Sequence, residues 1–311
     1  MNQAVRSECI LGVHSIDHVG FSVPDLSVAE RFYKSFGLDV RSEGAGLGLY
    51  ASGQPTRSAS IGEAKQKQLS YLSFGIFEAD APRFRDRLSR LGVPLISPAP
   101  VAGSNGLWFR DPAGLLIELR VSEKSSPNRK PRAAPAPGEN VRGAPSRSGA
   151  PLVHPRRLSH AMIFTVDLKR IIAFYSDVLG LRLTDRSGYN VGFMHGVHGS
   201  DHHMLGLVNS TAIGLHHTSW EVDSFNEVGL GAMQMAGRGF ADGWGVGRHV
   251  LGSNYFHYVR DPWSSFAEYS AEIDFIPPGA IWEAGDHPPE DSFYVWGPEP
   301  PSDFTVNHEI K

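Results

Sequence analysis

Hydrophobic and polar residues follow the same order in two blocks of this chain. Each block opens with a short apolar run, at residues 16–23 and 159–166, which an aspartate follows, Asp25 and Asp167. Apolar residues then recur at helical spacing until a glycine interrupts them. This order predicts a strand, a helix N-cap, an amphipathic helix and a glycine C-cap in both blocks.

Each block continues with further short elements. Apolar and polar residues alternate at 68–77 and again at 217–222, which predicts one strand in each block. Helical spacing follows at 79–91 in the first block and at 224–236 in the second. The mixture of strands and helices within each block predicts an α+β fold.

The two blocks also align residue by residue. IDHVGFSVPDLSVAERFYKSFGL, which opens the first block, matches LSHAMIFTVDLKRIIAFYSDVLGL, and the match places His18 on His160. WFRDPAGLLIELR matches YVRDPWSSFAEYS, which places Glu118 on Glu268. The Asp-Pro pair in each of these segments predicts a tight turn between two strands. An internal repeat of this kind indicates that one structural unit occurs twice.

A chain of 311 residues has room for two such domains. We place an N-terminal domain at 1–121 and a catalytic domain at 158–275. Residues 122–157, rich in Pro, Ser, Gly and Arg, are expected to form a mobile linker or a strap over the surface. Residues 276–311 carry several Trp, Tyr and Phe, so we expect an ordered tail on this domain or on a neighbouring subunit.

Composition narrows the class of protein. The chain is 41% hydrophobic and 20% charged, with a net charge of −4, which gives no reason to expect nucleic-acid or membrane binding. The linker is basic but lacks the interleaved aromatic residues that stack on bases. One cysteine, Cys9, excludes an internal disulfide, and the N-terminus lacks the apolar core of a signal peptide. We therefore expect a soluble protein of the cytoplasm.

His160, His217 and Glu268 are the first candidates for chemistry. They fall in three predicted strands of the second block, and strands of one curved sheet can bring their side chains to one point. Two imidazoles and one carboxylate form a facial triad that leaves open positions on a metal, usually iron(II). A single histidine in a strand is more often a core or surface residue, so the interpretation depends on the repeat.

The first block lacks a complete set of these residues. It has His18 and Glu118, but Tyr71 falls near the position where His217 stands in the second block. We therefore predict that the first block is a structural half without a metal.

Three further residues form a second layer of candidates. His203 precedes His217 on a neighbouring strand, where a neutral imidazole would serve as general acid and base. His249 and Tyr258 could orient a substrate hydroxyl and stabilise an oxyanion, although local packing is the alternative for both. His202, His216 and His257 each neighbour a candidate and are expected to point to the opposite face. We assign no role to the histidines that we place in loops or tails: His14, His154, His195, His198, His287 and His308.

With these motifs the chain resembles the type I extradiol dioxygenases of the vicinal oxygen chelate superfamily. The segments that carry the resemblance are LSHAMIFTVDLKRIIAFYSDVLGLRLTD, HMLGLVNSTAIGLHHTSWEV and GRHVLGSNYFHYVRDPWSSFAEYS. The resemblance implies two tandem domains, each built from paired βαβββ modules that form an open curved sheet around a cup. It also implies Fe(II), or Mn(II) in some members, on His160, His217 and Glu268.

The same resemblance implies a function. It is the cleavage of a catechol-type ring beside its hydroxyls, with both atoms of dioxygen entering the product, in the breakdown of aromatic compounds. His203 would be the acid–base catalyst, with His249 and Tyr258 as its partners. The implied partners are an aromatic diol and dioxygen, in a homo-oligomer. Two alternatives stay open: another metal enzyme of the superfamily, of glyoxalase or isomerase type, and a small-molecule-binding module. The sequence leaves the identity of the diol open.

Overall fold

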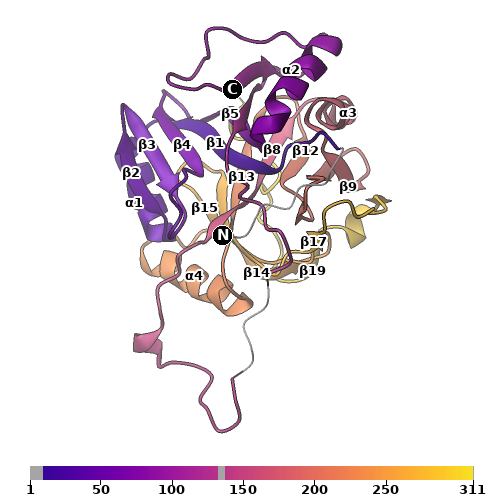
Figure 1. The fold of residues 1–311 in the computed structure, drawn as a ribbon. Coiled ribbons are helices and arrows are strands. Elements are labelled where there is room, and N and C mark those ends of the chain that lie inside the picture. The colour runs from indigo at the N-terminus through magenta and orange to yellow at the C-terminus, as the bar shows by residue number, and fades with distance from the viewer. Residues whose placement is uncertain (1–9, 132–136, 311) are drawn as a thin grey trace.

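The computed structural model describes residues 10–131 and 137–310, which form two units that pack side by side (Figure 1). The elements of the first unit are β1 (Ser15–Val23), α1 (Leu26–Phe36), β2 (Asp39–Glu43), β3 (Gly46–Tyr50), β4 (Ala59–Glu63), β5 (Gln68–Ile76), η1 (Glu78–Asp80), α2 (Ala81–Arg90), β6 (Leu107–Arg110) and β7 (Leu116–Val121). Its seven strands form one sheet in the order β2-β3-β4-β1-β5-β7-β6.

The second unit repeats this plan with more strands. Its elements are β8 (Arg157–Thr165), α3 (Leu168–Leu179), β9 (Arg182–Ser187), β10 (Val191–His195), β11 (Ser200–Asp201), β12 (Leu205–Asn209), β13 (Gly214–Glu221), α4 (Phe225–Gly237), β14 (Gly243–His249), β15 (Tyr255–Arg260) and β16 (Phe266–Ala271). The large sheet runs β18-β9-β10-β12-β8-β13-β16-β15-β14-β19, where β18 (Gly285–Asp286) and β19 (Tyr294–Trp296) come from the tail.

Both units are built from two halves that meet at a central antiparallel pair. β1 pairs with β5 antiparallel and with β4 parallel, and β8 pairs in the same way with β13 and β12. This arrangement confirms the predicted α+β fold with paired modules. The second half of the first unit departs from the βαβββ pattern, because residues 91–106 form no strand before β6. Pro94, Pro98 and Pro100 lie in this segment and supply no N–H group for strand pairing.

The predicted helix ends are confirmed in both units. The Asp25 carboxylate accepts hydrogen bonds from the backbone N–H groups of Ser27 and Val28, at 2.8 and 3.1 Å. Asp167 accepts from the N–H of Arg170 at 3.2 Å. Gly37 and Gly180 end the two helices with φ of 97° and 75°, in the left-handed region that a residue without Cβ adopts at low cost.

Residues that repeat in the sequence pack across the boundary between the units. The Tyr175 hydroxyl on α3 donates to Asp111 of the first unit at 2.8 Å. In the reverse direction, Lys67 of the first unit forms a buried ion pair with Asp261, which matches Asp111 in the repeat. α1 and α4 also lie side by side (Figure 1), and Phe36 stacks on the ring of Tyr269 with centroids 3.9 Å apart. The repeated Asp-Pro turns therefore join the two units as well as their own strands.

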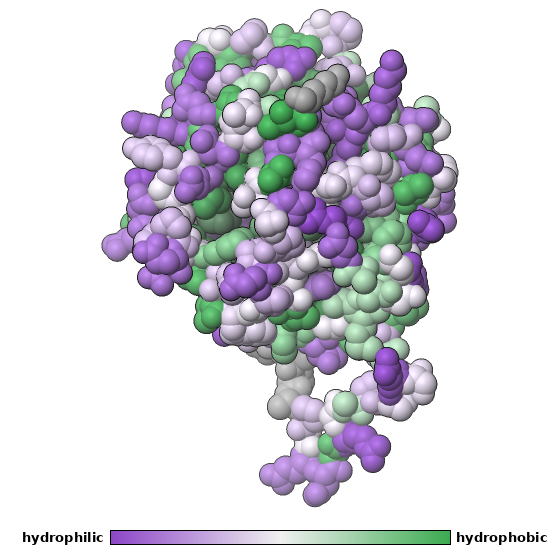
Figure 2. Space-filling view, turned by 180° about the vertical axis from the view of Figure 1, so that it is seen from behind, coloured by the Kyte–Doolittle hydropathy of each residue, from purple (hydrophilic) through white to green (hydrophobic). Residues whose placement is uncertain are grey.

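The linker and the tail behave differently. The described residues 137–149 of the linker are exposed, and Figure 2 shows this loop projecting from the body of the molecule. The tail packs on the second unit: β18 extends the sheet beside β9, and β19 extends it beside β14. Near its end, Glu309 accepts hydrogen bonds from the N–H groups of Leu69 and Leu215, one in each unit. The described part of the chain contains no helix long and apolar enough to cross a bilayer.

Candidate metal centre

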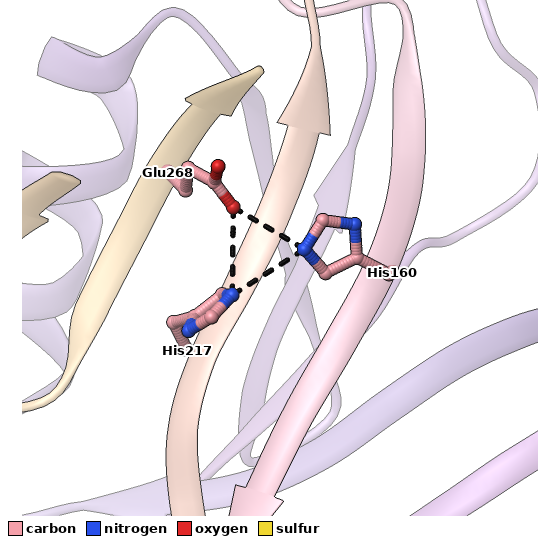
Figure 3. Close-up of side chains that lie close together, drawn as sticks. All are labelled: His160, His217 and Glu268. Carbon is pink, nitrogen blue, oxygen red and sulfur yellow. Dashed lines mark hydrogen bonds and ion pairs between the residues drawn. The ribbon is translucent and has the colours of Figure 1, made fainter. Parts of the chain in front are cut away.

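His160, His217 and Glu268 lie on three adjacent strands and point toward one another (Figure 3). The strand register explains this convergence. Ser219 of β13 lies opposite His160 of β8 on one side and opposite Glu268 of β16 on the other. His217, two residues before Ser219, shares its face of the strand. The small side chain of Ser219 leaves space between its two cross-strand neighbours.

The three ligand atoms form a nearly equilateral triangle. His160 Nε2 lies 3.3 Å from Glu268 Oε2, His217 Nε2 lies 3.4 Å from the same oxygen, and the two nitrogens are 3.4 Å apart. Donor atoms bound at about 2.1 Å to one ion, at angles somewhat above 90°, would have separations of roughly 3 to 3.5 Å. All three side chains are at most 5% exposed.

Hydrogen bonds around the triangle determine which imidazole nitrogens carry a proton. Ser159 donates its hydroxyl hydrogen to Asp201, so its oxygen is left to accept from His160 Nδ1, 3.4 Å away. His217 Nδ1 lies 2.7 Å from His216 Nδ1, and the backbone of Phe304 is hydrogen-bonded to His216. With His216 donating to that backbone, its Nδ1 accepts from His217 Nδ1–H. Both Nε2 atoms then carry lone pairs.

Three lone-pair atoms therefore converge on one buried point. Glu268 Oε2 is buried and has no hydrogen-bond partner among the described residues, whereas Oε1 accepts from Asn254 Nδ2 at 3.1 Å. Burial raises the pKa of Glu268, but hydrogen bonds and charge from His160 and His217, when either imidazole is protonated, outweigh burial and lower that pKa. A proton in the triangle therefore resides on an imidazole, from which a metal would displace it, and the carboxylate stays ionised. Burial also lowers the pKa of His217, which favours the neutral imidazole. Neutral imidazoles and an ionised carboxylate are the donor set that suits a divalent transition metal.

The corresponding point in the first unit has a different chemistry. The register aligns Tyr71 with Gly20, as it aligns His217 with Met162. The Tyr71 hydroxyl and His18 Nε2 are hydrogen-bonded at 3.0 Å, so the nitrogen that would bind a metal is occupied. A Cβ on Gly20 would lie 2.0 Å from the Tyr71 ring, which shows how closely this tyrosine is packed. The prediction that Tyr71 stands where the second unit has His217 agrees with this register.

A cavity of about 390 Å³ opens over the triangle and brings all three further candidates together. His203 lies in the short loop just before β12, and its ring centroid is 4.2 Å from that of His160. Tyr258 is the cross-strand neighbour of Glu268, and its hydroxyl is 2.8 Å from His249 Nε2. His249 Nδ1 donates to the carbonyl of Phe293 in the tail at 2.8 Å. Burial lowers the pKa of His249 to about 4, so its Nε2 accepts from the Tyr258 hydroxyl.

The structure corrects two expectations about the other histidines, His216 and His195. His216 was expected on the opposite face, yet it lines the cavity and contacts His217. The reason is a break in the register of β13 between Leu215 and His217, which inserts His216 as an extra residue. His195 was placed in a loop but is the last residue of β10 and is buried. His257, by contrast, does not line the cavity, as expected.

Sequence reasoning missed two parts of the site. Asn254, which holds Glu268, lies between β14 and β15 and carries no motif that would have identified it. The outer partner of His203 is His202, which in turn contacts Asp185. Only the adjacency of the two histidines in the sequence could have suggested that pair.

Comparison with known proteins agrees with this geometry. The profile of the Glyoxalase/Bleomycin resistance protein/Dioxygenase superfamily matches residues 15–119 and 157–268. Metapyrocatechase 2 of Cupriavidus necator is 50% identical over 96% of this chain and 93% of its own.

Solved structures share the fold. Homoprotocatechuate 2,3-dioxygenase from Brevibacterium fuscum superposes with a TM-score of 0.76 at 17% identity, over 97% of this chain and 95% of its own. The Mn(II)-bound glyoxalase from Novosphingobium aromaticivorans gives 0.74 at 22% identity, over 94% of both chains. This chain therefore belongs to the Glyoxalase/Bleomycin resistance protein/Dioxygenase superfamily and, within it, to the extradiol dioxygenases.

Proposed function

We propose that the chain cleaves a catechol-type ring beside its hydroxyls, with an iron(II) ion on His160, His217 and Glu268. The observation that carries the proposal is the buried triangle of lone-pair atoms beneath a cavity lined by His203, His249 and Tyr258. The 50% identity to a metapyrocatechase over nearly the whole chain supports the same reaction. The triad residues are the proposed ligands, and the other three are the proposed catalytic residues.

The side chains of the cavity have distinct tasks in this proposal. When bound, the iron would hold the diol and dioxygen together and carry electrons between them. His203 takes a proton from a substrate hydroxyl and returns it when the ring opens. Burial lowers the pKa of His203 well below its ordinary value, so it starts neutral and is able to accept that proton. The Tyr258 hydroxyl donates to His249 and lies beside Glu268, so its oxygen can accept a hydrogen bond from a substrate hydroxyl and orient it.

The cavity wall narrows the class of diol. Apolar side chains make up much of the wall, including Met162, Val191, Phe193 and Leu251. The described residues that line the cavity include no lysine or arginine. A carboxylate on the ring would therefore be desolvated without a counter-ion, which costs several kcal/mol in a buried apolar site. We propose that the substrate is a neutral catechol, unsubstituted or with apolar substituents.

A substrate panel tests this selectivity. Catechol and 4-methylcatechol are compared with 3,4-dihydroxybenzoate and 3,4-dihydroxyphenylacetate by oxygen uptake. We expect kcat/KM for the carboxylated rings to be lower by at least about 100-fold, the equivalent of roughly 3 kcal/mol. Equal kcat/KM values across the panel would contradict the neutral-substrate proposal while leaving ring cleavage itself intact.

The ligand assignment is tested by metal retention. Glu268→Ala removes one of three ligands, so we expect it to lose bound iron after gel filtration, whereas the wild-type chain keeps about one ion. Glu118→Ala is the matched control, because Glu118 holds the corresponding position in the first unit and accepts from Ser73. We expect the control to retain iron. Stoichiometric iron in Glu268→Ala would contradict the assignment.

Two finer expectations belong to the same proposal. Loading with Mn(II) instead of Fe(II) compares the two metals at one site, and we propose that Fe(II) gives the higher turnover. A homo-oligomer stays a prediction from the resemblance, and sedimentation equilibrium measures it. A location in the cytoplasm stays a prediction from the sequence. The alternative function of glyoxalase or isomerase type would require iron-loaded protein that consumes no dioxygen with any catechol.

A further inference from the structure

His202 forms a buried contact with His203 that the proposed chemistry does not yet use. Their Nδ1 atoms are 3.0 Å apart, and the two rings are perpendicular with centroids 5.3 Å apart. His202 is 1% exposed and does not line the cavity. It therefore stands behind His203, on the side away from the candidate metal centre.

Asp185 on β9 binds the other side of His202. Its Oδ2 lies 2.8 Å from His202 Nε2, and Trp282 Nε1 donates to the same oxygen at 3.3 Å. Its Oδ1 accepts from the Gly285 N–H at 2.8 Å and lies 3.1 Å from His287 Nε2. Three of these four groups belong to the C-terminal tail. Burial raises the pKa of Asp185, but its hydrogen bonds outweigh burial and hold that pKa below its ordinary value, so the carboxylate is ionised.

Asp185, His202 and His203 form a row of hydrogen-bonded side chains, and these contacts determine which imidazole nitrogens in the row carry a proton. An ionised carboxylate only accepts, so His202 Nε2–H donates to Asp185. With the Nε2 proton donated to Asp185, Nδ1 is the nitrogen of the His202 imidazole that can carry a lone pair. The Nδ1 of a neutral His202 then carries a lone pair and accepts from His203 Nδ1–H. Because His203 Nδ1 holds the proton, its Nε2 presents a lone pair to the cavity.

We propose that Asp185 and His202 are positioning residues that fix the orientation and tautomer of His203, and that the C-terminal tail holds Asp185 in place for this task. The inference rests on the proposed function, because His203 acts there as the base. When His203 Nε2 takes a proton from a substrate hydroxyl, the resulting imidazolium donates through Nδ1 to His202, and Asp185 stabilises the positive charge.

The same connection to the tail recurs at two other imidazoles of the site. His249 Nδ1 donates to the carbonyl of Phe293, and the backbone of Phe304 is hydrogen-bonded to His216 behind His217. At each of three imidazoles, the ring nitrogen that faces away from the cavity is linked by hydrogen bonds to residues 282–304, either directly or through one or two other groups. These imidazoles are His203, His217 and His249. This recurrence explains why an extension beyond the repeated unit packs on the catalytic half.

Asp185→Asn tests the row with little change in shape. The Gly285 N–H, 2.8 Å from Oδ1, is a closer donor than Trp282 Nε1, 3.3 Å from Oδ2, so we expect the amide oxygen at the Oδ1 position and the amide NH₂ facing His202. His202 Nε2 must then accept, which moves its proton to Nδ1 and forces His203 to carry its proton on Nε2. We expect ¹⁵N imidazole spectra of the metal-free protein to show this exchange of tautomers. We also expect kcat to fall about 100-fold, with KM and iron content within about twofold of wild type.

Further variants separate positioning from general damage. Asp286→Asn removes an exposed carboxylate of the tail strand β18 that pairs with Arg186 of β9, so we expect wild-type tautomers and kcat within about twofold. His202→Asn places an amide oxygen near the former Nδ1 and should keep the His203 tautomer and at least about a tenth of kcat. His202→Leu offers no acceptor and should match Asp185→Asn.

The outcomes separate this inference from the proposed function. A proton on His203 Nε2 in the wild-type protein would overturn the inference, and so would an unchanged tautomer and kcat in Asp185→Asn. The spectra need no metal and no turnover. A wild-type protein with the expected tautomers and no oxygen uptake would therefore refute the proposed function while supporting the positioning role.

Discussion

At the scale of single residues, the site depends on which nitrogen of each imidazole faces the centre. Ser159 accepts from His160, and His216 accepts from His217, so both Nε2 lone pairs point at the ionised Glu268. An arrangement of three acceptors without a proton is unfavourable unless a cation occupies the space between them. Metal binding therefore depends on the polar groups behind the ligands, Ser159 and His216, as well as on the ligands themselves.

His203→Phe tests the proposed acid–base role at this scale. The phenyl ring fills similar space and has no titratable group, so we expect iron retention and a fall in kcat of roughly 10² to 10⁴. His257→Phe is the matched control, because His257 lies next to Tyr258 in β15 but does not line the cavity. We expect its kcat to stay within about twofold. Steady-state oxygen uptake measures both variants, and full activity in His203→Phe would remove this residue from the mechanism.

Single residues also show where sequence reasoning stops. His160 and Glu268 could be selected because the repeat aligned them with His18 and Glu118. The position of His216 could not, because it depends on an extra residue in β13 that no alternation pattern marks. Asp185 could not either, because its partners Trp282, Gly285 and His287 come from a distant part of the chain.

At the scale of the elements, strand register determines the site. β8, β13 and β16 are neighbours, and Ser219 lies between His160 and Glu268. The short strands and capped helices could be predicted from local patterns, since caps and alternation act over a few residues. The absence of a strand at 91–106 was missed, although its prolines carried the signal.

Ser219→Leu tests this account of the register. Ser219 is fully buried, so a larger side chain there must displace His160 or Glu268. We expect iron affinity to fall at least about tenfold, measured by competition with a chelator. Ser219→Ala keeps the space and should bind iron like the wild-type chain. Unchanged affinity in Ser219→Leu would show that the side chain does not lie between the ligands.

At the scale of the whole molecule, the two units and the tail act as one support for the site. Two side-chain pairs join the units: Tyr175 of the second unit with Asp111 of the first, and Lys67 of the first unit with Asp261 of the second. Glu309 of the tail contacts both units. The sequence repeat revealed these residues but not their contacts across the boundary, because a repeat carries no information on how its copies pack. The tail packs on the second unit, which is one of the two positions that the sequence left open for it.

Lys67→Met tests the joint between the units. Both partners of this ion pair are almost fully buried, with side chains 4% and 1% exposed, so the change leaves the Asp261 charge unpaired. We expect the free energy of unfolding to fall by about 3 to 5 kcal/mol in urea denaturation. Lys34→Met removes an exposed helix pair with Glu30 and should cost only a few tenths of a kcal/mol. Equal losses would show that the buried pair does not stabilise the joint.

The central claim is that this chain opens the ring of a neutral catechol beside its hydroxyls. The most direct measurement is to load the protein with Fe(II) without air, add catechol in aerated buffer, and quantify oxygen uptake and product together. We predict one dioxygen consumed per ring and a yellow semialdehyde acid, cleaved next to the two hydroxyls. Iron-loaded protein that consumes no oxygen, or a dicarboxylic product cleaved between the hydroxyls, would contradict it.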